Sequence, residues 1–171
     1  MKEYFKVSLT LGIVCGIVTL LLSYVYSVTS PIIEESTNRK SVELCKAVYD
    51  ADAFEEIEVT DELGEDISKI YRAPDGGYVI AASGTGYGGD LTVMVGIKDG
   101  TVTGTAVLTS SETEGIGTRV EDESFASQFT GKTEENIGSV DTVAGATRSS
   151  KAYIMAVERA VKAYNEMEAG K

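Results

Sequence analysis

The feature that most constrains this chain is an uncharged apolar run near its N-terminus. No residue from Val7 to Ile33 carries a charge, and the stretch Phe5–Val28 is rich in Leu, Ile and Val. A helix of about 20 such residues, rising about 1.5 Å per residue, crosses a hydrocarbon core of about 30 Å. The run therefore predicts one transmembrane helix, which we assign to residues 1–30.

A cleaved signal peptide is the alternative interpretation of this run. The run is longer than the usual apolar region of a signal peptide, and the first alanine of the chain is Ala47, so the run contains no AxA cleavage site. We therefore expect the segment to be retained. Lys6 lies next to the run, whereas the basic residues on the other side begin at Arg39, which favours a cytoplasmic N-terminus and places the rest of the chain on the outer side of the membrane.

Net charge and residue types exclude several classes of function. The formal net charge is -12, which makes nucleic acid an improbable partner. The chain has no histidine, so Ser-His-Asp and Cys-His catalysis and most zinc sites are excluded. Cys15 and Cys45 lack the CxxC spacing, and we expect neither a disulfide nor a metal site.

The remaining residues predict an α+β fold, an antiparallel sheet packed with helices. Residues 31–52 have the pattern of a helical stalk, and residues 53–171 that of one domain. Short runs of alternating or β-branched residues predict strands at 54–59, 69–73, 77–83, 91–98 and 101–110.

Turn residues indicate how these strands pair. Asp99-Gly100 separates the last two strands and is typical of a two-residue type I′ hairpin, so those strands should be antiparallel. Residues 74–77 (PDGG) predict a second turn of the same kind.

The last third of the chain predicts a loop followed by helices. Residues 111–120 show no periodicity, and residues 121–129 have the pattern of a short helix. The segment that follows residue 146 repeats apolar residues at helical spacing, which predicts a C-terminal helix packed on the sheet. The apolar positions are Tyr153, Val157, Val161, Tyr164 and Met167.

Two apparent nucleotide-binding motifs fail on their context. Residues 84–89 (GTGYGG) satisfy GxGxxG, but a strand follows them where a dinucleotide fold needs a helix, so they predict a turn between strands. Residues 131–133 (GKT) lack the upstream glycine of a P-loop, because Ala126 stands at that position. The acidic residues show no metal-binding spacing, and we assign no metal.

The segment Asp141–Ser150 (DTVAGATRSS) carries the candidate chemistry. Gly145 and Ala146 allow a bulky group to approach the backbone, and Thr147, Ser149 and Ser150 offer hydroxyls at the start of the C-terminal helix. A helix N-terminus presents unpaired N–H groups and stabilises a phosphate. The alternative is that Thr147 or Ser149 is an ordinary helix cap.

This segment resembles the flavinylation motif of the FMN-binding domain found in the G subunit of the Rnf complex and the C subunit of the sodium-pumping NADH:quinone oxidoreductase. Residues 87–129 also resemble the core strand pair of that family and its ETPGLG-type loop. Two positions depart from the family pattern: Ala144 replaces the usual Ser or Thr, and Glu114 precedes Gly115 where proline is common.

The resemblance implies that FMN is joined to Thr147 through a phosphoester, so that the threonine is modified and no residue of the chain is catalytic. It implies that a separate flavin transferase attaches the FMN from FAD, and that the segment beginning at Asp141 is what the transferase recognises. A threonine with no histidine near it is a weak nucleophile, which agrees with attachment by another enzyme. Further residues expected at the flavin are Gly145, Ala146, Ser149, Thr109, Glu112, Thr113, Gly115 and Gly117.

The implied function is electron transfer as a redox subunit of a membrane-bound, ion-translocating ferredoxin:NAD oxidoreductase, with the other subunits as partners. The C subunit of the quinone reductase and a stand-alone anchored FMN domain for extracellular electron transfer remain alternatives. A non-redox anchored domain is a third alternative, and it would carry no flavin.

Overall fold

A computed structural model describes residues 2–60 and 63–169. The chain divides into two compact units, Met1–Arg39 and Lys40–Lys171. The first unit is formed by helix α1 (Lys2–Val48), whose last residues belong to the second unit. The described residues of the second unit also contain a five-stranded sheet, helices α2 (Glu123–Ala126) and α3 (Thr147–Ala169), and short 3-10 helices that include η4 (Ile137–Ser139).

Within the described residues, α1 is the single helix long and apolar enough to cross a membrane, judged by its length and composition. It includes the apolar run identified in the sequence. The helix continues through Pro31 without a break, so no change of secondary structure marks residue 30. The ranges 1–30, 31–52 and 53–171 therefore remain a prediction, and residues 1, 61–62, 170 and 171 lie outside the described part.

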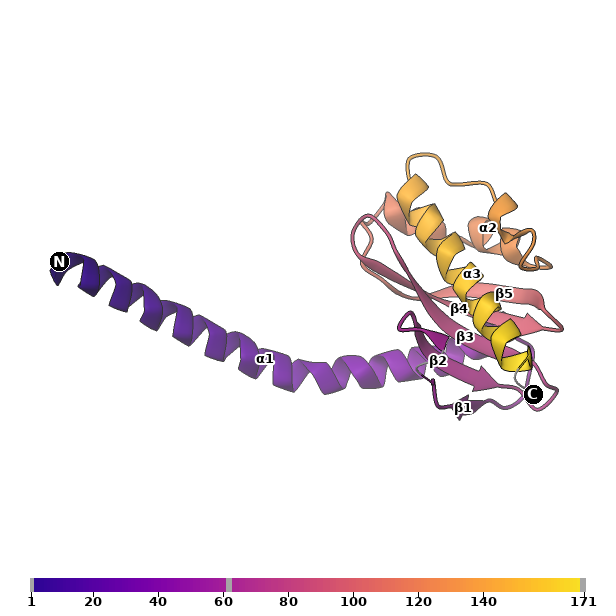
Figure 1. The fold of residues 1–171 in the computed structure, drawn as a ribbon, viewed down its shortest axis with the longest axis horizontal. Coiled ribbons are helices and arrows are strands. Elements are labelled where there is room, and N and C mark those ends of the chain that lie inside the picture. Colours follow the sequence, from indigo (N-terminus) through magenta and orange to yellow (C-terminus); the bar gives the residue numbers. More distant parts are fainter. Residues whose placement is uncertain (1, 61–62, 170–171) are drawn as a thin grey trace. The chain divides into compact units, whose positions relative to one another are not determined.

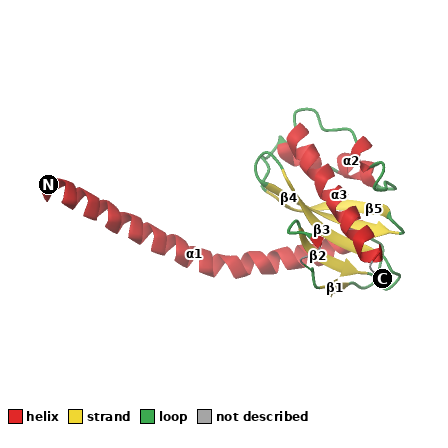
Figure 2. Ribbon diagram, viewed as in Figure 1, coloured by secondary structure: helices red, strands yellow, loops and turns green. Residues whose placement is uncertain are grey.

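The sheet is an antiparallel meander in which each strand pairs with the next one in the chain (Figures 1 and 2). Its order is β1-β2-β3-β4-β5. The strands are β1 (Glu55–Ile57), β2 (Ile67–Arg72), β3 (Tyr78–Thr85), β4 (Asp90–Lys98) and β5 (Thr101–Ser110). All five lie where the sequence predicts strands, and the predicted α+β class is confirmed.

The two predicted turns differ in type. Asp99 and Gly100 have φ of 50° and 71°, as a type I′ hairpin requires at both central positions. At the other turn only Gly76 has a positive φ, of 87°, and Ala73 bonds Gly77 across a three-residue loop. The second turn is therefore not of the predicted two-residue kind, because Pro74 has its φ locked near -65° and cannot adopt the positive value.

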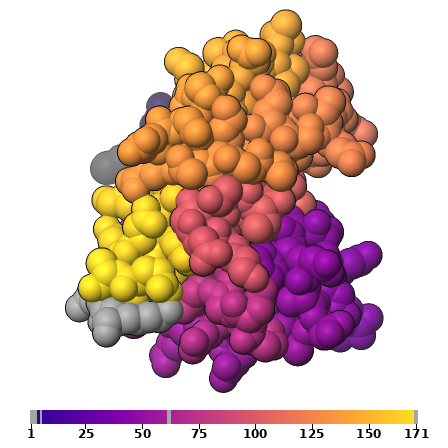
Figure 3. Space-filling model, turned by 90° about the vertical axis from the view of Figure 1, so that its right-hand side faces the viewer, coloured from indigo at the N-terminus to yellow at the C-terminus, as the bar shows by residue number. Residues whose placement is uncertain are grey.

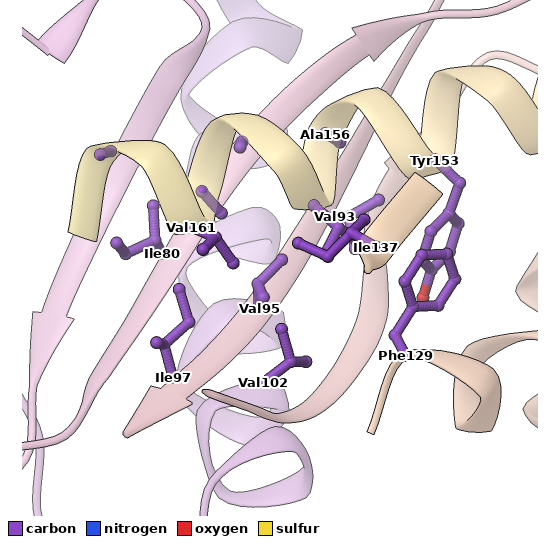
Figure 4. Close-up of a cluster of buried hydrophobic side chains, with 14 of the residues drawn as sticks. Ile80, Val93, Val95, Ile97, Val102, Phe129, Ile137, Tyr153, Ala156 and Val161 are labelled. Carbon is purple, nitrogen blue, oxygen red and sulfur yellow. The ribbon is translucent and has the colours of Figure 1, made fainter. Parts of the chain in front are cut away.

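Helix α3 packs along one face of the sheet and closes the larger core. The predicted apolar stripe is confirmed: Tyr153, Val157 and Val161 are buried completely. Figure 4 shows Val161 of α3 pointing toward Ile80 of β3 and Val95 of β4, while Tyr153 lies against Phe129. Gly84 on β3 allows the close approach, because a Cβ at that position would collide with the carbonyl group of Ala152 in α3.

The C-terminal end of α1 covers the opposite face of the sheet. Ser41, Cys45 and Val48 face the sheet and are buried, while Val42, between them in the sequence, is 55% exposed. Gly96 and Gly104 pair across β4 and β5, and a Cβ at either one would crowd the last turn of α1. The paired glycines therefore form the seat of this helix end.

The segment between β5 and α3 packs along the edge strand β5, with hydrogen bonds from Val102 to Lys132 and from Thr105 to Ala126, and it appears in orange in Figure 3. The predicted loop at 111–120 ends in a 3-10 helix, η2 (Gly117–Glu121). The predicted helix at 121–129 is split into α2 and a 3-10 turn, η3 (Ser127–Phe129). Phe125 anchors this segment by packing edge-on against Phe129 and Tyr153, and Phe129 stacks on Tyr153.

Candidate functional site

A cavity of about 430 Å³ lies at the N-terminal end of α3, and we call it the α3 pocket. Three segments form its walls: the β3–β4 loop (residues 86–89), the segment that follows β5, and the start of α3. In Figure 1 the β3–β4 loop and the first turn of α3 lie at the same end of the domain. The lining residues are Tyr87, Glu112, Thr113, Ile116, Gly117, Gly145, Ala146, Thr147, Arg148 and Ser149.

A tight turn positions the start of α3 in this pocket. The N–H of Ala146 donates to the carbonyl of Val143 at 3.0 Å, and Gly145 has a φ of 84° at the third position of that turn. Positive φ at this position is the requirement of a type II turn, which selects glycine. No protein atom lies within 4 Å of a Cβ built on Gly145, so within the protein it is the positive φ that requires glycine here, and the close approach of a ligand stays a prediction.

Three neighbouring hydroxyls at the helix start have different environments. Thr147 is the first residue of α3 and is exposed to the pocket. Ser150 is buried, and its hydroxyl donates to the carbonyl of Ala146 at 2.9 Å and accepts from the N–H of Val143 at 3.0 Å. The hydroxyl that stabilises the motif turn is therefore that of Ser150, and not that of Thr147 or Ser149.

The third residue, Ser149, is buried, but its hydroxyl is unbonded and stays open to the pocket. Ser149 is 2% exposed and lines the α3 pocket, and within the described part of the chain its side chain has no hydrogen-bond partner. The first N–H groups of any helix also lack a carbonyl partner inside the helix. The pocket therefore offers a free hydroxyl and free backbone donors at one helix end, with the exposed Arg148 beside them, which is a suitable environment for an anion.

Glu112 joins two walls of the pocket. Its carboxylate accepts from the N–H of Tyr87 at 2.8 Å and from the N–H of Gly88 at 3.4 Å. The same carboxylate packs against Gly117: a Cβ built on Gly117 would lie only 2.5 Å from it, which is too close. The carboxylate of Glu112, which was predicted to contact a flavin ring, is thus hydrogen-bonded to the backbone of the β3–β4 loop.

The loop that contains Gly115 is folded on itself. Thr113 accepts with its carbonyl from the N–H of Ile116 at 3.2 Å and of Gly117 at 2.8 Å. Gly115, with a φ of 75°, supplies the turn but does not line the pocket. Arg119 donates to the carbonyl of Ala144 at 3.0 Å, which ties this loop to the motif turn.

The structure brings most of the predicted site residues together. Those that line the α3 pocket are Glu112, Thr113, Gly117, Gly145, Ala146, Thr147 and Ser149. Thr109 lies on β5 opposite Thr92, and Asp141 bonds through its backbone to Gln128, and neither lines the pocket.

The sequence interpretation missed two large side chains of the pocket. Tyr87 is 73% exposed and Ile116 is 57% exposed. Tyr87 lies inside the rejected GxGxxG motif, so the correct rejection of a dinucleotide fold also removed it from consideration. An exposed aromatic residue in a glycine-rich loop was the signal that could have identified it.

The α3 pocket lies inside a segment that matches a known protein family. Residues 86–162 match the FMN-binding domain family. The match begins in the β3–β4 loop and ends in α3, so it contains every lining residue of the pocket. The FMN-binding domain match confirms the resemblance predicted from the motif and from residues 87–129.

Relatives match the chain over almost its whole length. It is 28% identical to the G subunit of the proton-translocating ferredoxin:NAD(+) oxidoreductase complex of Clostridium ljungdahlii, over 99% of this chain and 96% of that protein. It is 27% identical to the G subunit of the Na(+)-translocating ferredoxin:NAD(+) oxidoreductase complex of Acetobacterium woodii, over 97% and 94%. It is 29% identical to the G subunit of the ion-translocating oxidoreductase complex of Methanosarcina acetivorans, over 94% of each chain. The similarity therefore includes the N-terminal helix as well as the FMN-binding domain.

Proposed function

We propose that this chain is an electron-transfer flavoprotein subunit of a membrane-bound, ion-translocating ferredoxin:NAD oxidoreductase, and that it carries FMN joined to Thr147 through a phosphoester. The observation that carries the proposal is the exposed hydroxyl of Thr147 at the first position of α3, inside a pocket that lies within the FMN-binding domain match. The names and the full-length similarity of the relatives support the type of complex.

The residues of the pocket fit the phosphate of FMN. The phosphate would stand at the N-terminus of α3, where the helix dipole and the free N–H groups favour a negative charge. The unbonded hydroxyl of Ser149 is a further donor, and Arg148 supplies a countercharge. FMN would supply the redox chemistry, which no side chain of this pocket performs.

Thr147 acts in this proposal as an acceptor. A flavin transferase would bring FAD, and the Thr147 oxygen would form a new P–O bond to the FMN phosphorus. The pyrophosphate P–O bond would break, AMP would leave, and the hydroxyl proton would pass to the transferase or to solvent. Since the chain contains no histidine, activation of the hydroxyl falls to the transferase.

Two attachments, of FMN to the domain and of the domain to the membrane, would keep the cofactor near its electron partners. The phosphoester prevents loss of FMN, and α1 holds the domain at the membrane, which raises its effective concentration at the other subunits. The C subunit of the quinone reductase and a stand-alone anchored FMN domain have the same chemistry. The relatives from Clostridium, Acetobacterium and Methanosarcina are all G subunits of ion-translocating complexes, and two of these complexes are ferredoxin:NAD(+) oxidoreductases, which favours that type of complex here.

Gel fluorescence after co-expression with a flavin transferase tests the proposal. The wild-type chain should give a fluorescent band after denaturation, because a covalent flavin stays attached. Thr147→Ala should remove the band. Thr142→Ala is the matched control: it removes an exposed threonine hydroxyl from the same segment but outside the pocket, so its band should persist.

Two results contradict the proposal. A dark wild-type band would show that the chain accepts no covalent flavin under these conditions. A fluorescent Thr147→Ala band would assign the attachment to another residue.

A further inference from the structure

The glycine-rich β3–β4 loop wraps around a carboxylate of the same chain, that of Glu112. The Glu112 carboxylate accepts from two backbone N–H groups of this loop, those of Tyr87 and Gly88. A Cβ on Gly86 or Gly88 would collide with Glu112 or with its backbone neighbour Ser111. The carboxylate therefore requires glycine at Gly86 and the Ser111 carbonyl requires it at Gly88, while the N–H groups of Tyr87 and Gly88 are already bonded to Glu112.

This arrangement fixes the backbone at Tyr87 and leaves its side chain free. The N–H of Tyr87 donates to Glu112 at 2.8 Å, while 73% of the residue is exposed at the α3 pocket. Within the described residues of the Lys40–Lys171 unit, the exposed large hydrophobic residues are Val42, Tyr87, Ile116 and Met155. Two of these four, Tyr87 and Ile116, line the α3 pocket. Exposed apolar groups gathered at one pocket indicate a binding surface.

We propose that Tyr87 is the aromatic side chain that covers the flavin ring, and that Glu112 is a positioning residue that holds Tyr87 over the pocket. The inference rests on the proposed function, because it takes the flavin to be the occupant of the α3 pocket. Aromatic rings favour offset stacking or edge contact with a planar π-system, and a tyrosine at the mouth of a pocket can cover one while its hydroxyl stays in water.

The chemistry of tyrosine supplies a measurement of this contact. A phenol in contact with a photoexcited flavin gives it one electron, and the electron returns to the phenol, so the fluorescence is lost without net reaction. Phenylalanine keeps the ring but is a much poorer donor. Tyr87→Phe therefore preserves the packing of the pocket and removes the quenching.

The experiment uses the full chain, loaded by co-expression with a flavin transferase and purified in detergent. Flavin fluorescence is measured per bound flavin in the native state and after denaturation. The wild type should be several-fold brighter when denatured. Tyr87→Phe should be several-fold brighter than the wild type in the native state, with the same brightness when denatured. The native fluorescence of Glu112→Ala should lie between those of the wild type and Tyr87→Phe, because the loop loses the carboxylate that holds it. Glu112→Gln should recover part of the quenching, because its side chain keeps one acceptor oxygen.

Tyr164→Phe is the matched control. Tyr164 lies in α3, 17 positions after Thr147, or about 25 Å along a helix that rises about 1.5 Å per residue. Its native fluorescence should equal that of the wild type. Equal native brightness of Tyr87→Phe and the wild type would overturn the assignment of Tyr87, and Glu112→Ala as dark as the wild type would overturn the role of Glu112.

The failures of this inference and of the proposed function are distinguishable. Absence of fluorescence from the denatured wild type overturns the covalent attachment. Denatured fluorescence that is present, with native fluorescence independent of residue 87, overturns only the role of Tyr87. If Tyr87→Phe does not fold, lifetimes of the wild-type flavin decide: a lifetime as long as that of free FMN excludes a contacting tyrosine.

Discussion

Hydroxyl position explains why one of three neighbouring side chains is suited to modification. Thr147 is exposed, Ser149 is buried but unbonded, and Ser150 is buried and bonded to the motif turn. All three follow the same turn, yet Thr147 is the one of the three that is exposed. Under the proposed attachment, exposure alone would select Thr147, without a preference for threonine over serine.

Gly145 allows the tight turn that precedes α3, because it adopts a positive φ. Gly145→Ala should destabilise the domain by about 1–2 kcal/mol, because a residue with a Cβ is strained at a φ of 84°. Thermal unfolding followed by circular dichroism measures the effect. Gly138→Ala is the control, since its Cβ would make only an ordinary contact of 3.7 Å with Glu158. Equal stability of the two variants would contradict the requirement for a positive φ.

At the scale of elements, the last turn of α1 is held on the sheet by backbone and polar contacts. Thr103 donates to the carbonyl of Val48 at 2.8 Å, over the glycine pair of β4 and β5. Just beyond this turn, the Tyr49 hydroxyl donates to Asp75 at 2.7 Å. Lys98 also donates to Asp75, so one carboxylate joins the end of α1, the β2–β3 turn and β4.

This carboxylate makes the attachment sensitive to acid. Hydrogen bonds from Lys98 and Tyr49 lower the pKa of Asp75 from 3.8 to about 2. A carboxyl whose pKa is lower in the folded state stabilises the fold above its unfolded pKa, and that contribution is lost as the pH falls from about 4 to about 2. Asp75→Asn should therefore be less stable than the wild type at neutral pH, and the difference should shrink across this range.

Melting temperatures between neutral pH and pH 2 check this expectation. Asp99→Asn is the control, because Asn tolerates the φ of 50° at that turn. No hydrogen bond or ion pair involves the Asp99 side chain in the part of the chain that the structure describes. Parallel curves for the wild type and Asp75→Asn would contradict a role for the carboxylate in acid stability.

At the scale of the whole molecule, one chain combines a membrane helix with a domain suited to hold a flavin. The relatives are similar over both parts, so the combination is shared with subunits of ion-translocating complexes. Covalent attachment would matter more for a domain on the outer side of the membrane than for one in the cytoplasm, because FMN that dissociates outside is lost to the cell.

The outer location can be checked by labelling. In a Cys15→Ser background, Ser124→Cys places an exposed thiol on α2. Native Cys45 should contribute little background, since it is buried completely and burial raises the pKa of its thiol to about 12. A membrane-impermeant maleimide should label Ser124→Cys in intact cells. Labelling that appears only after lysis would place the domain in the cytoplasm.

The sequence by itself determined the membrane helix, the order of the strands and the C-terminal helix. These follow from local rules: an uncharged apolar run, residues of alternating polarity, Asp99-Gly100 at a hairpin, and an apolar stripe at helical spacing. The candidate attachment residue was also visible, because the motif around Thr147 is continuous in the chain.

Only the tertiary structure decided how the pocket is built. Glu112 and Tyr87 are 25 positions apart, and no periodicity connects them. Ser150 is hydrogen-bonded to the motif turn whereas Ser149 is not, and Gly96 and Gly104 form the seat of α1. Both features also depend on which segments meet in space. Local patterns report the conformation of one segment, whereas a wall made of three segments arises from packing among residues distant in the chain.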